Sequence, residues 1–255
     1  MFKLMKYEIK GRYKTTLGIC LGILLVNAYV FIKTYSLPAD QAYTAVIPVA
    51  FILIISSFVL SLIRGEKMYQ RDLYGDTGYL MFTIPQKGVS IIGSKVLLSF
   101  IEFILFEALS VLSSLIIISR LPESELVMNL FNKYLALATK LTFSFMSVYL
   151  FALVLIFFSH SISKAALNKN KYSKPASALV FILLAYTIQK AYDFIALKMP
   201  YTINIVGAPV EQNFGDFSIS IPSFDLNIAC TIFMVLIFIG IFMGASYLLE
   251  KKVDL

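Results

Sequence analysis

Residues 64–95 read RGEKMYQRDLYGDTGYLMFTIPQKGVSIIGSK and lie between two long apolar runs. They form the longest charged segment between two such runs, and they contain a short helix signal of their own. Asp76 or Thr77 can cap a following turn, because the side-chain oxygen of an N-cap residue accepts hydrogen bonds from the free N–H groups of the first turn. Pro85 ends that turn, since proline cannot continue the helical hydrogen bonds.

The predicted turn is amphipathic. Its apolar side chains fall on two sides, Leu80, Met81 and Ile84 on one and Tyr79 and Phe82 on the other. A short amphipathic helix between two membrane spans needs an apolar partner for its apolar side. The candidates are the lipid headgroup layer, the protein's own spans and a second protein that docks from that side, and we favour the last.

The composition predicts an integral membrane protein. Hydrophobic residues make up 59% of the 255-residue chain and charged residues 15%, whereas soluble domains have about 45–50% and about 25%. Cys20 and Cys230 both lie inside apolar runs, so they are interpreted as small buried residues rather than as a disulfide. The net charge of +7 lies in the loops of a membrane protein, and we therefore expect no nucleic-acid partner.

Six apolar runs are long enough to cross a hydrocarbon layer of about 30 Å, which takes about 20 helical residues. They are residues 15–32, 45–63, 89–118, 141–163, 176–197 and 226–249. The predicted fold class is therefore all-α, a single transmembrane domain over residues 1–255 with six transmembrane helices. The third run is overlong, which predicts a tilted helix or one that begins outside the hydrocarbon layer.

Residues 1–14 mix apolar and basic side chains at helical spacing. Phe2, Met5 and Ile9 can lie in the membrane interface while the lysines between them face water or anionic lipid. We favour an N-terminal interfacial helix that leads into the first span, and the alternative is an unstructured basic leader. No cleavable signal peptide is expected, because the first apolar run follows this segment and is long enough to remain as a span.

The basic residues predict the orientation of the spans. With both termini in the cytoplasm, the inner segments hold fifteen lysines and arginines and the outer segments hold five. Such an excess favours the cytoplasmic side, so the protein is predicted in the cytoplasmic membrane with both ends inside. Residues 64–88 then form a cytoplasmic loop and residues 198–225 an extracellular one.

The sequence carries no sign of covalent chemistry. It lacks the phosphate-binding pattern G-x-x-x-x-G-K-[ST]. The sole histidine, His160, has no Cys, Asp or Glu nearby in sequence, which favours an interfacial or packing role over metal binding. We therefore expect no catalytic residue, no metal site and no cofactor on this chain.

Ionisable residues within the spans are candidates for a transport pathway. A charge at the bilayer centre costs at least about 2.5–3.5 kcal/mol, so Glu102 and Glu107 should face protein or a water-filled cavity. They lie five residues apart, about 140° around a helix, and cannot line one narrow surface together. Glu107 continues into Ser110 and Ser114, a polar stripe that suits a cavity, a partner subunit or hydrogen bonding between helices.

Three further segments have predicted roles. Lys190 and Asp193 lie three apart on the fifth span and can pair on one helix face. The lysine-rich residues 164–174 favour anionic membrane lipid, with an acidic protein partner as the alternative. Prolines and glycines in 198–225 argue against one long helix, leaving a short strand at 217–221 or re-entry into the membrane open.

The chain resembles the permease subunits of ABC-2-type transporters of the Firmicutes. The resemblance rests on six spans, an amphipathic N-terminal segment and the sequence DLYGDTGYLMFTIPQKGVSIIGSKVL between the second and third spans. In that family the loop has an acidic residue, then GYL, then T-[LI]-P, and S-K downstream. The matching residues are Asp76, Gly78, Tyr79, Leu80, Thr83, Ile84, Pro85, Ser94 and Lys95.

The resemblance implies an ATP-driven transporter whose ATP hydrolysis is done by a separate chain, so this chain would not itself be an enzyme. The loop would form a coupling helix in a groove of an ABC ATPase subunit, present in two copies, and a second permease chain would complete the pore as a homo- or heterodimer. Export of peptide, drug or lipid-like cargo is implied. The expected coupling residues are Asp76, Thr77, Tyr79, Leu80, Met81, Phe82, Ile84 and Pro85.

A rival interpretation is an ion- or proton-driven secondary carrier that uses Glu102 and Glu107. Such carriers usually have internal repeats with broken spans at matching positions. The two halves of this sequence show no such repeat, and only Pro48 interrupts a span. The sequence therefore favours the permease.

Overall fold

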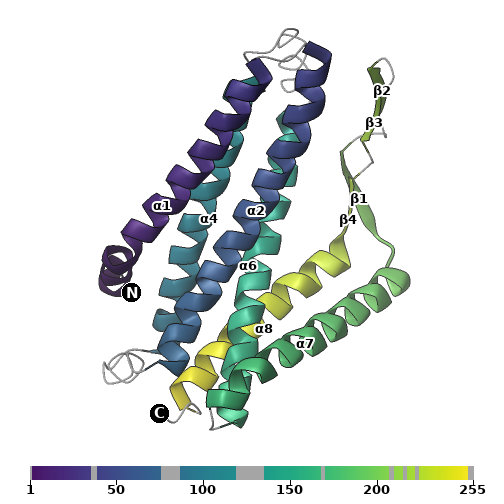
Figure 1. Cartoon of the computed structure of the whole chain (residues 1–255). Helices are drawn as coiled ribbons and strands as arrows, with labels where there is room; N and C mark the ends of the chain where they lie inside the picture. Colours follow the sequence, from purple (N-terminus) through teal and green to yellow (C-terminus); the bar gives the residue numbers. More distant parts are fainter. Residues whose placement is uncertain are drawn as a thin grey trace.

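A computed structural model gives the architecture of the chain (Figure 1). The structure describes residues 2–35, 39–75, 87–118, 135–167, 170–206, 210–214, 217–221 and 224–251. Within them, six helices are long and apolar enough to cross a membrane, which confirms the prediction of an all-α membrane protein with six spans. The helices are α1 (Phe2–Tyr35), α2 (Ala39–Tyr74), α4 (Gly88–Ile118), α6 (Leu135–Ala166), α7 (Asn170–Lys198) and α8 (Ile228–Lys251).

The helices form one bundle with both chain termini at the same end, as Figure 1 shows. Helix α4 packs against α1, α2 and α8, and α6 packs against α2, α7 and α8. We call the end that carries residues 2–12, 64–75, 87–95, 159–167, 170–178 and 244–251 the termini end. An even number of spans returns the chain to the side where it started, so this placement agrees with the six predicted spans.

The segment between α7 and α8 forms two antiparallel strand pairs. Strands β1 (Thr202–Val206) and β4 (Phe224–Asn227) pair at the base, and β2 (Val210–Phe214) and β3 (Phe217–Ile221) pair beyond them (Figure 1). The strand alternative for 217–221 is therefore confirmed. Asn227 ends this unit as the N-cap of α8, where its Oδ1 accepts a hydrogen bond from the Cys230 backbone N–H at 3.1 Å.

The predicted loop 64–88 is wrong over residues 64–74, which continue α2 as about three helical turns. The reason is tertiary packing: Met68, Tyr69, Asp72 and Leu73 share one face of the extension, and all four are buried. Charged side chains on the opposite face made this stretch resemble a loop. Only residues 76–86 of the predicted loop lie outside the described residues.

Residues 2–14 are the first turns of α1 and not a helix separated from it. Met5 is buried against the protein and Ile9 is exposed, so the two side chains have different surroundings. The position of this segment relative to a membrane stays a prediction. Helices α6 and α7 begin before and end after their predicted runs, whereas α8 begins two residues after the predicted 226, because Phe224–Asn227 form β4.

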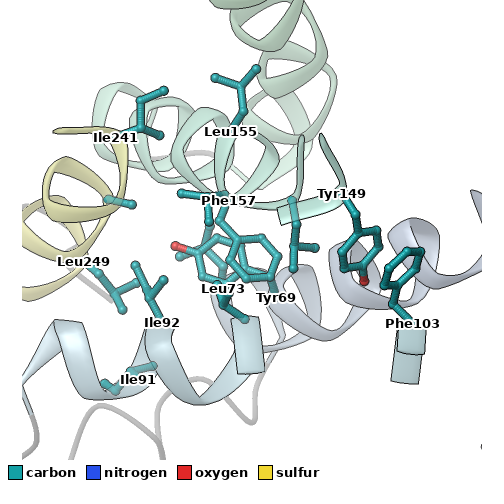
Figure 2. Packing of buried hydrophobic residues seen from close by; sticks show 14 residues of the cluster. Tyr69, Leu73, Ile91, Ile92, Phe103, Tyr149, Leu155, Phe157, Ile241 and Leu249 are labelled. Atoms are coloured by element: carbon teal, nitrogen blue, oxygen red, sulfur yellow. The ribbon is translucent and has the colours of Figure 1, made fainter. Parts of the chain in front are cut away.

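The apolar core is densest toward the termini end, where α2, α4, α6 and α8 meet (Figure 2). The Tyr69 ring stacks on Phe157 with centroids 4.4 Å apart, and the Phe103 ring stacks on Tyr149 at 4.1 Å. Offset-stacked aromatic pairs add about 0.5–1.5 kcal/mol beyond their buried area. The first pair holds α2 to α6 near the termini end, and the second holds α4 to α6 nearer the middle of the bundle.

Replacing Gly88 by alanine is expected to destabilise the protein by about 1–3 kcal/mol, the usual cost of overpacking. A Cβ at this position would collide with the Ser246 carbonyl oxygen, and that backbone atom of α8 cannot move aside like a side chain. The measurement is the thermal unfolding midpoint of the purified protein. Gly240→Ala is the matched control, because a Cβ there meets no atom within 4 Å. Equal midpoints for the two variants would contradict the close approach of α4 to α8.

Candidate functional site

The predicted coupling residues fall outside the described residues. They are Asp76, Thr77, Tyr79, Leu80, Met81, Phe82, Ile84 and Pro85. Their roles stay predictions. The structure does describe the two ends of their segment, Gly75 after α2 and Lys87 before α4, and shows how those ends are fastened to the bundle.

Glu102, one of the predicted pathway residues, lies in a buried cluster with two arginines. Arg64 donates to both carboxylate oxygens, from Nη2 to Oε1 at 2.8 Å and from Nε to Oε2 at 3.1 Å. Arg12 Nη2 donates to Oε2 at 3.1 Å, and the Thr16 hydroxyl donates to Oε1 at 3.0 Å. Glu102 is only 6% exposed, so its charge is neutralised inside the protein rather than by water.

Arg12 also ties α1 to the helical extension of α2. Its Nη2 donates to the Arg64 carbonyl oxygen at 3.2 Å, and its Nη1 lies 2.7 Å from the Met68 Sδ. The Arg64 Nη2 donates to the Thr16 hydroxyl at 2.7 Å. Side chains of α1, α2 and α4 are therefore joined at this level.

Lys95 is the centre of a second buried cluster from the same three helices. Its ammonium group donates to Glu8 Oε1 at 2.8 Å and to Asp72 Oδ2. The Lys95 side chain is 1% exposed, which a charged lysine tolerates only when it is paired. Arg71, more than half exposed, lies 3.5 Å from the other Asp72 oxygen. Asp72 precedes the segment 76–86 by four residues, and Lys95 follows it by nine.

The two clusters form one charge network of two layers, and each layer has one residue from α1, one from α2 and one from α4. Residues four apart on α1, eight apart on α2 and seven apart on α4 fall on one face of each helix. One layer holds Arg12, Arg64 and Glu102, and the other holds Glu8, Asp72 and Lys95. The six formal charges cancel. Their burial is costly for any one charge left alone, so the network favours one relative arrangement of α1, α2 and α4.

Sequence reasoning missed most of this network. Glu8 and Arg12 were assigned to an interfacial segment, and Arg64 and Asp72 to a loop. The regular spacing of charges on each helix face was the available signal. It was hidden because the partners lie 23 to 90 residues apart in the chain, and no local pattern identifies which faces meet.

The other predicted pathway residues do not join Glu102. The Ser110 hydroxyl lies 2.8 Å from the Ser57 hydroxyl of α2, and Ser114 Oγ donates to the Ser110 carbonyl oxygen at 2.8 Å. Both serines are buried, so they serve contacts within and between helices. Glu107 differs, because its buried Oε1 has no hydrogen-bond partner among the described residues.

His160 is buried against α2, which agrees with the predicted packing role, and the fold also brings an acidic side chain of that helix close to it. Its Nε2 lies 3.3 Å from Glu66 Oε1, and its Nδ1 lies 3.4 Å from the Tyr74 hydroxyl oxygen. Gln70 Nε2 also lies 3.3 Å from His160 Nε2, so three side chains of α2 contact the ring. Nowhere in the described ranges do three His, Cys, Asp or Glu side chains gather as a metal site would require.

The predicted pair of Lys190 and Asp193 does not form in the structure, which describes both residues. Asp193 Oδ1 accepts a hydrogen bond from Gln189 Nε2 at 2.9 Å, and Lys190 Nζ lies 5.7 Å from the centroid of the Tyr186 ring. Both alternatives are contacts along the same exposed helix. The Lys190 ammonium group is attracted to the face of the Tyr186 ring, while the aliphatic part of the side chain lies along apolar surface.

Comparison with protein-family models, with curated proteins and with solved structures gave no match to this chain. The assignment of a function therefore depends on the residues and on their geometry.

Proposed function

We propose that this chain is the membrane-spanning permease subunit of an ATP-driven transporter of the ABC-2 type. It lies in the bacterial cytoplasmic membrane with both termini in the cytoplasm, and it exports a peptide, drug or lipid-like cargo. A separate ATPase, in two copies, drives it through residues 64–88, and a second permease chain completes the pore. The sequence supports this through the resemblance of residues 72–97 to the coupling loop of that family.

The observation that carries the proposal is the attachment of both ends of the segment 76–86 to the bundle. Before it, Asp72 is bound to Lys95 of α4, which also binds Glu8 of α1. After it, the Gly88 backbone N–H donates to Glu250 of α8 at 3.2 Å. A push on the segment would thus act at once on α1, α2, α4 and α8.

This attachment suits a rigid lever. Separating the charged partners would leave buried charges unpaired at a cost of about 3–5 kcal/mol, so α1, α2 and α4 should move as one body. An ATPase that binds the segment more tightly in one of two bundle arrangements would shift the equilibrium toward that arrangement. The charge network is then the part that passes the motion on to the spans.

The double substitution Leu80→Asp and Met81→Asp is expected to abolish co-purification of the chain with its ATPase, because it places two charges on the apolar side of the coupling turn. The ATPase to test is a stand-alone one encoded next to this chain's gene. The amount of the variant in the membrane should not change, since residues 76–86 lie outside the six spans.

Tyr7→Asp with Ile9→Asp is the matched control, because it puts two charges on exposed apolar residues of α1 at the same end of the bundle. The control should keep the ATPase. Recovery of the ATPase at native yield with the Leu80 and Met81 variant would refute the coupling role.

The secondary carrier remains the alternative, and one observation favours it. Glu107 has a buried carboxylate oxygen without a hydrogen-bond partner among the described residues. Glu102, the other residue that a carrier would need, is already bound by two arginines. The two interpretations differ in their energy source, because a carrier stops when the proton gradient collapses and an ATP-driven permease does not.

A further inference from the structure

A hollow of about 250 Å³ lies at the termini end between the last turns of α2 and the first turns of α7. It is lined by Lys67, Gln70, Arg71, Tyr74, Gly75 and Lys174. Three of these residues are cationic, and none of the lining residues in the described part of the chain is acidic. The hollow is open to its surroundings, and we call it the cationic hollow.

The cations converge from two helices. Lys67 and Arg71 lie four apart on the same face of α2, and Lys174 comes from α7, where its Nζ lies 5.5 Å from the centroid of the Tyr74 ring. The nearby carboxylates are engaged elsewhere, Glu66 with His160 and Gln70, and Asp72 mainly with Lys95. Like charges gathered around one space repel each other, and an anion bound between them would relieve that repulsion.

Counted from the ends of the apolar runs, part of the hollow falls within the polar layer of a bilayer. The apolar run of α2 ends near residue 63, and at 1.5 Å per residue Lys67 lies about 6 Å and Arg71 about 12 Å beyond it. Lys174 precedes the apolar run of α7 by two residues. The polar layer of a bilayer extends about 5–8 Å beyond each side of the hydrocarbon core, so at least Lys67 and Lys174 are within reach of headgroup phosphates.

An apolar ridge runs from the hollow along α7 toward the middle of the membrane. From Lys174 the ridge continues in steps of four residues through Ala178, Ile182 and Tyr186, all exposed. Ile182 is 62% exposed and Tyr186 60%. A cationic hollow followed by an exposed apolar ridge is complementary to a molecule with an anionic head and apolar tails.

We propose that the cationic hollow binds the phosphate headgroup of an anionic phospholipid, whose acyl chains lie along the ridge of α7. Lys67, Arg71 and Lys174 surround the phosphate, and the Tyr74 side of the hollow limits its depth. The proposal concerns a lipid bound at the side of the bundle, and it holds whether or not the chain is a transport subunit.

The test uses the full chain in detergent, titrated with phosphatidylglycerol, phosphatidylcholine or inorganic phosphate. Bound lipid is counted by native mass spectrometry. Each basic residue near a membrane surface contributes about 1 kcal/mol to binding of anionic lipid, so replacing Lys67, Arg71 and Lys174 by glutamine should weaken phosphatidylglycerol binding about a hundredfold. Lys174→Gln alone should weaken it about fivefold. Binding of phosphatidylcholine should not change.

The matched control is the replacement of Lys6, Lys10 and Lys14 by glutamine, which removes the same charge from exposed positions on α1 at the same end. A small loss in the control and a large one in the hollow variant supports a built site. Equal losses, or an unchanged preference for phosphatidylglycerol in the hollow variant, would overturn it. Competition by inorganic phosphate at the concentration of the lipid would overturn the lipid assignment. Unfolding midpoints in phosphatidylcholine show whether each variant is folded, and Lys174→Gln serves if the triple variant is not.

Discussion

Glu102→Ala is expected to destabilise the protein by about 3–5 kcal/mol, the usual result of removing one partner from a buried ion pair. Glu102 neutralises two arginines at once, and Arg12 and Arg64 would be left close together without a counter-charge. Their side chains are only 12% exposed, so water can compensate only in part. The measurement is the thermal or denaturant unfolding of the chain in detergent or nanodiscs.

Two further variants show whether the effect comes from charge. Glu102→Gln keeps the size of the side chain and removes its charge, so it should also be destabilised because the two guanidinium groups remain unneutralised. Glu107 lies on the same helix, and its buried oxygen has no hydrogen-bond partner among the described residues. Glu107→Ala should therefore change stability much less. If Glu107→Ala and Glu102→Ala unfolded at the same temperature, the ion pairs would not hold the helices together.

Lys95→Met is expected to destabilise the protein by a similar amount, about 3–5 kcal/mol. Methionine matches the length of the lysine stem, so the change mainly removes the ammonium group. Glu8 and Asp72 would then face each other in a site where the present side chain is 1% exposed. Arg71, at 3.5 Å from Asp72 and more than half exposed, would offset only part of this repulsion. Unfolding in detergent measures the loss.

The combination of Lys95→Met with Glu8→Gln and Asp72→Asn should recover part of the lost stability. Neutral side chains of similar size remove the repulsion, and buried ion pairs can often be replaced by uncharged residues without loss. A triple variant no more stable than Lys95→Met would mean that the loss came from packing and not from charge. A stable triple variant would keep the fold without the charges of the Lys95 layer. Transport measured on it would then show whether those charges have a role besides stability.

The network changes how the segment 64–88 is understood. As a free loop it would have to transmit motion through flexible backbone. With residues 64–74 as a rigid extension of α2, only the stretch around the predicted coupling turn lies beyond the described helices. Asp72 and Gly88 then fix the two ends of that stretch to three other helices. If the proposed coupling role holds, the two attached ends would pass a displacement of this stretch on to those helices.

The sequence alone determined the number of spans and the limits of several elements. The third span was predicted at 89–118 and is α4, Gly88–Ile118, because an apolar run of that length has no other stable arrangement in a membrane than a helix. The spans depend on near neighbours in the chain, whose spacing can be read directly. For 217–221 the sequence left a short strand and re-entry into the membrane open, and the structure shows the strand β3.

Only the tertiary structure decided the partners of the buried charges and the length of α2. Arg12 and Glu102 are 90 residues apart, and Lys95 and Glu8 are 87 apart. Helical periodicity tells which side chains share a face, but which faces meet depends on the packing of the whole bundle. Arg64 and Asp72 resembled loop residues because their charges suit water, and they lie in a helix because α4 supplies the opposite charges, Glu102 and Lys95.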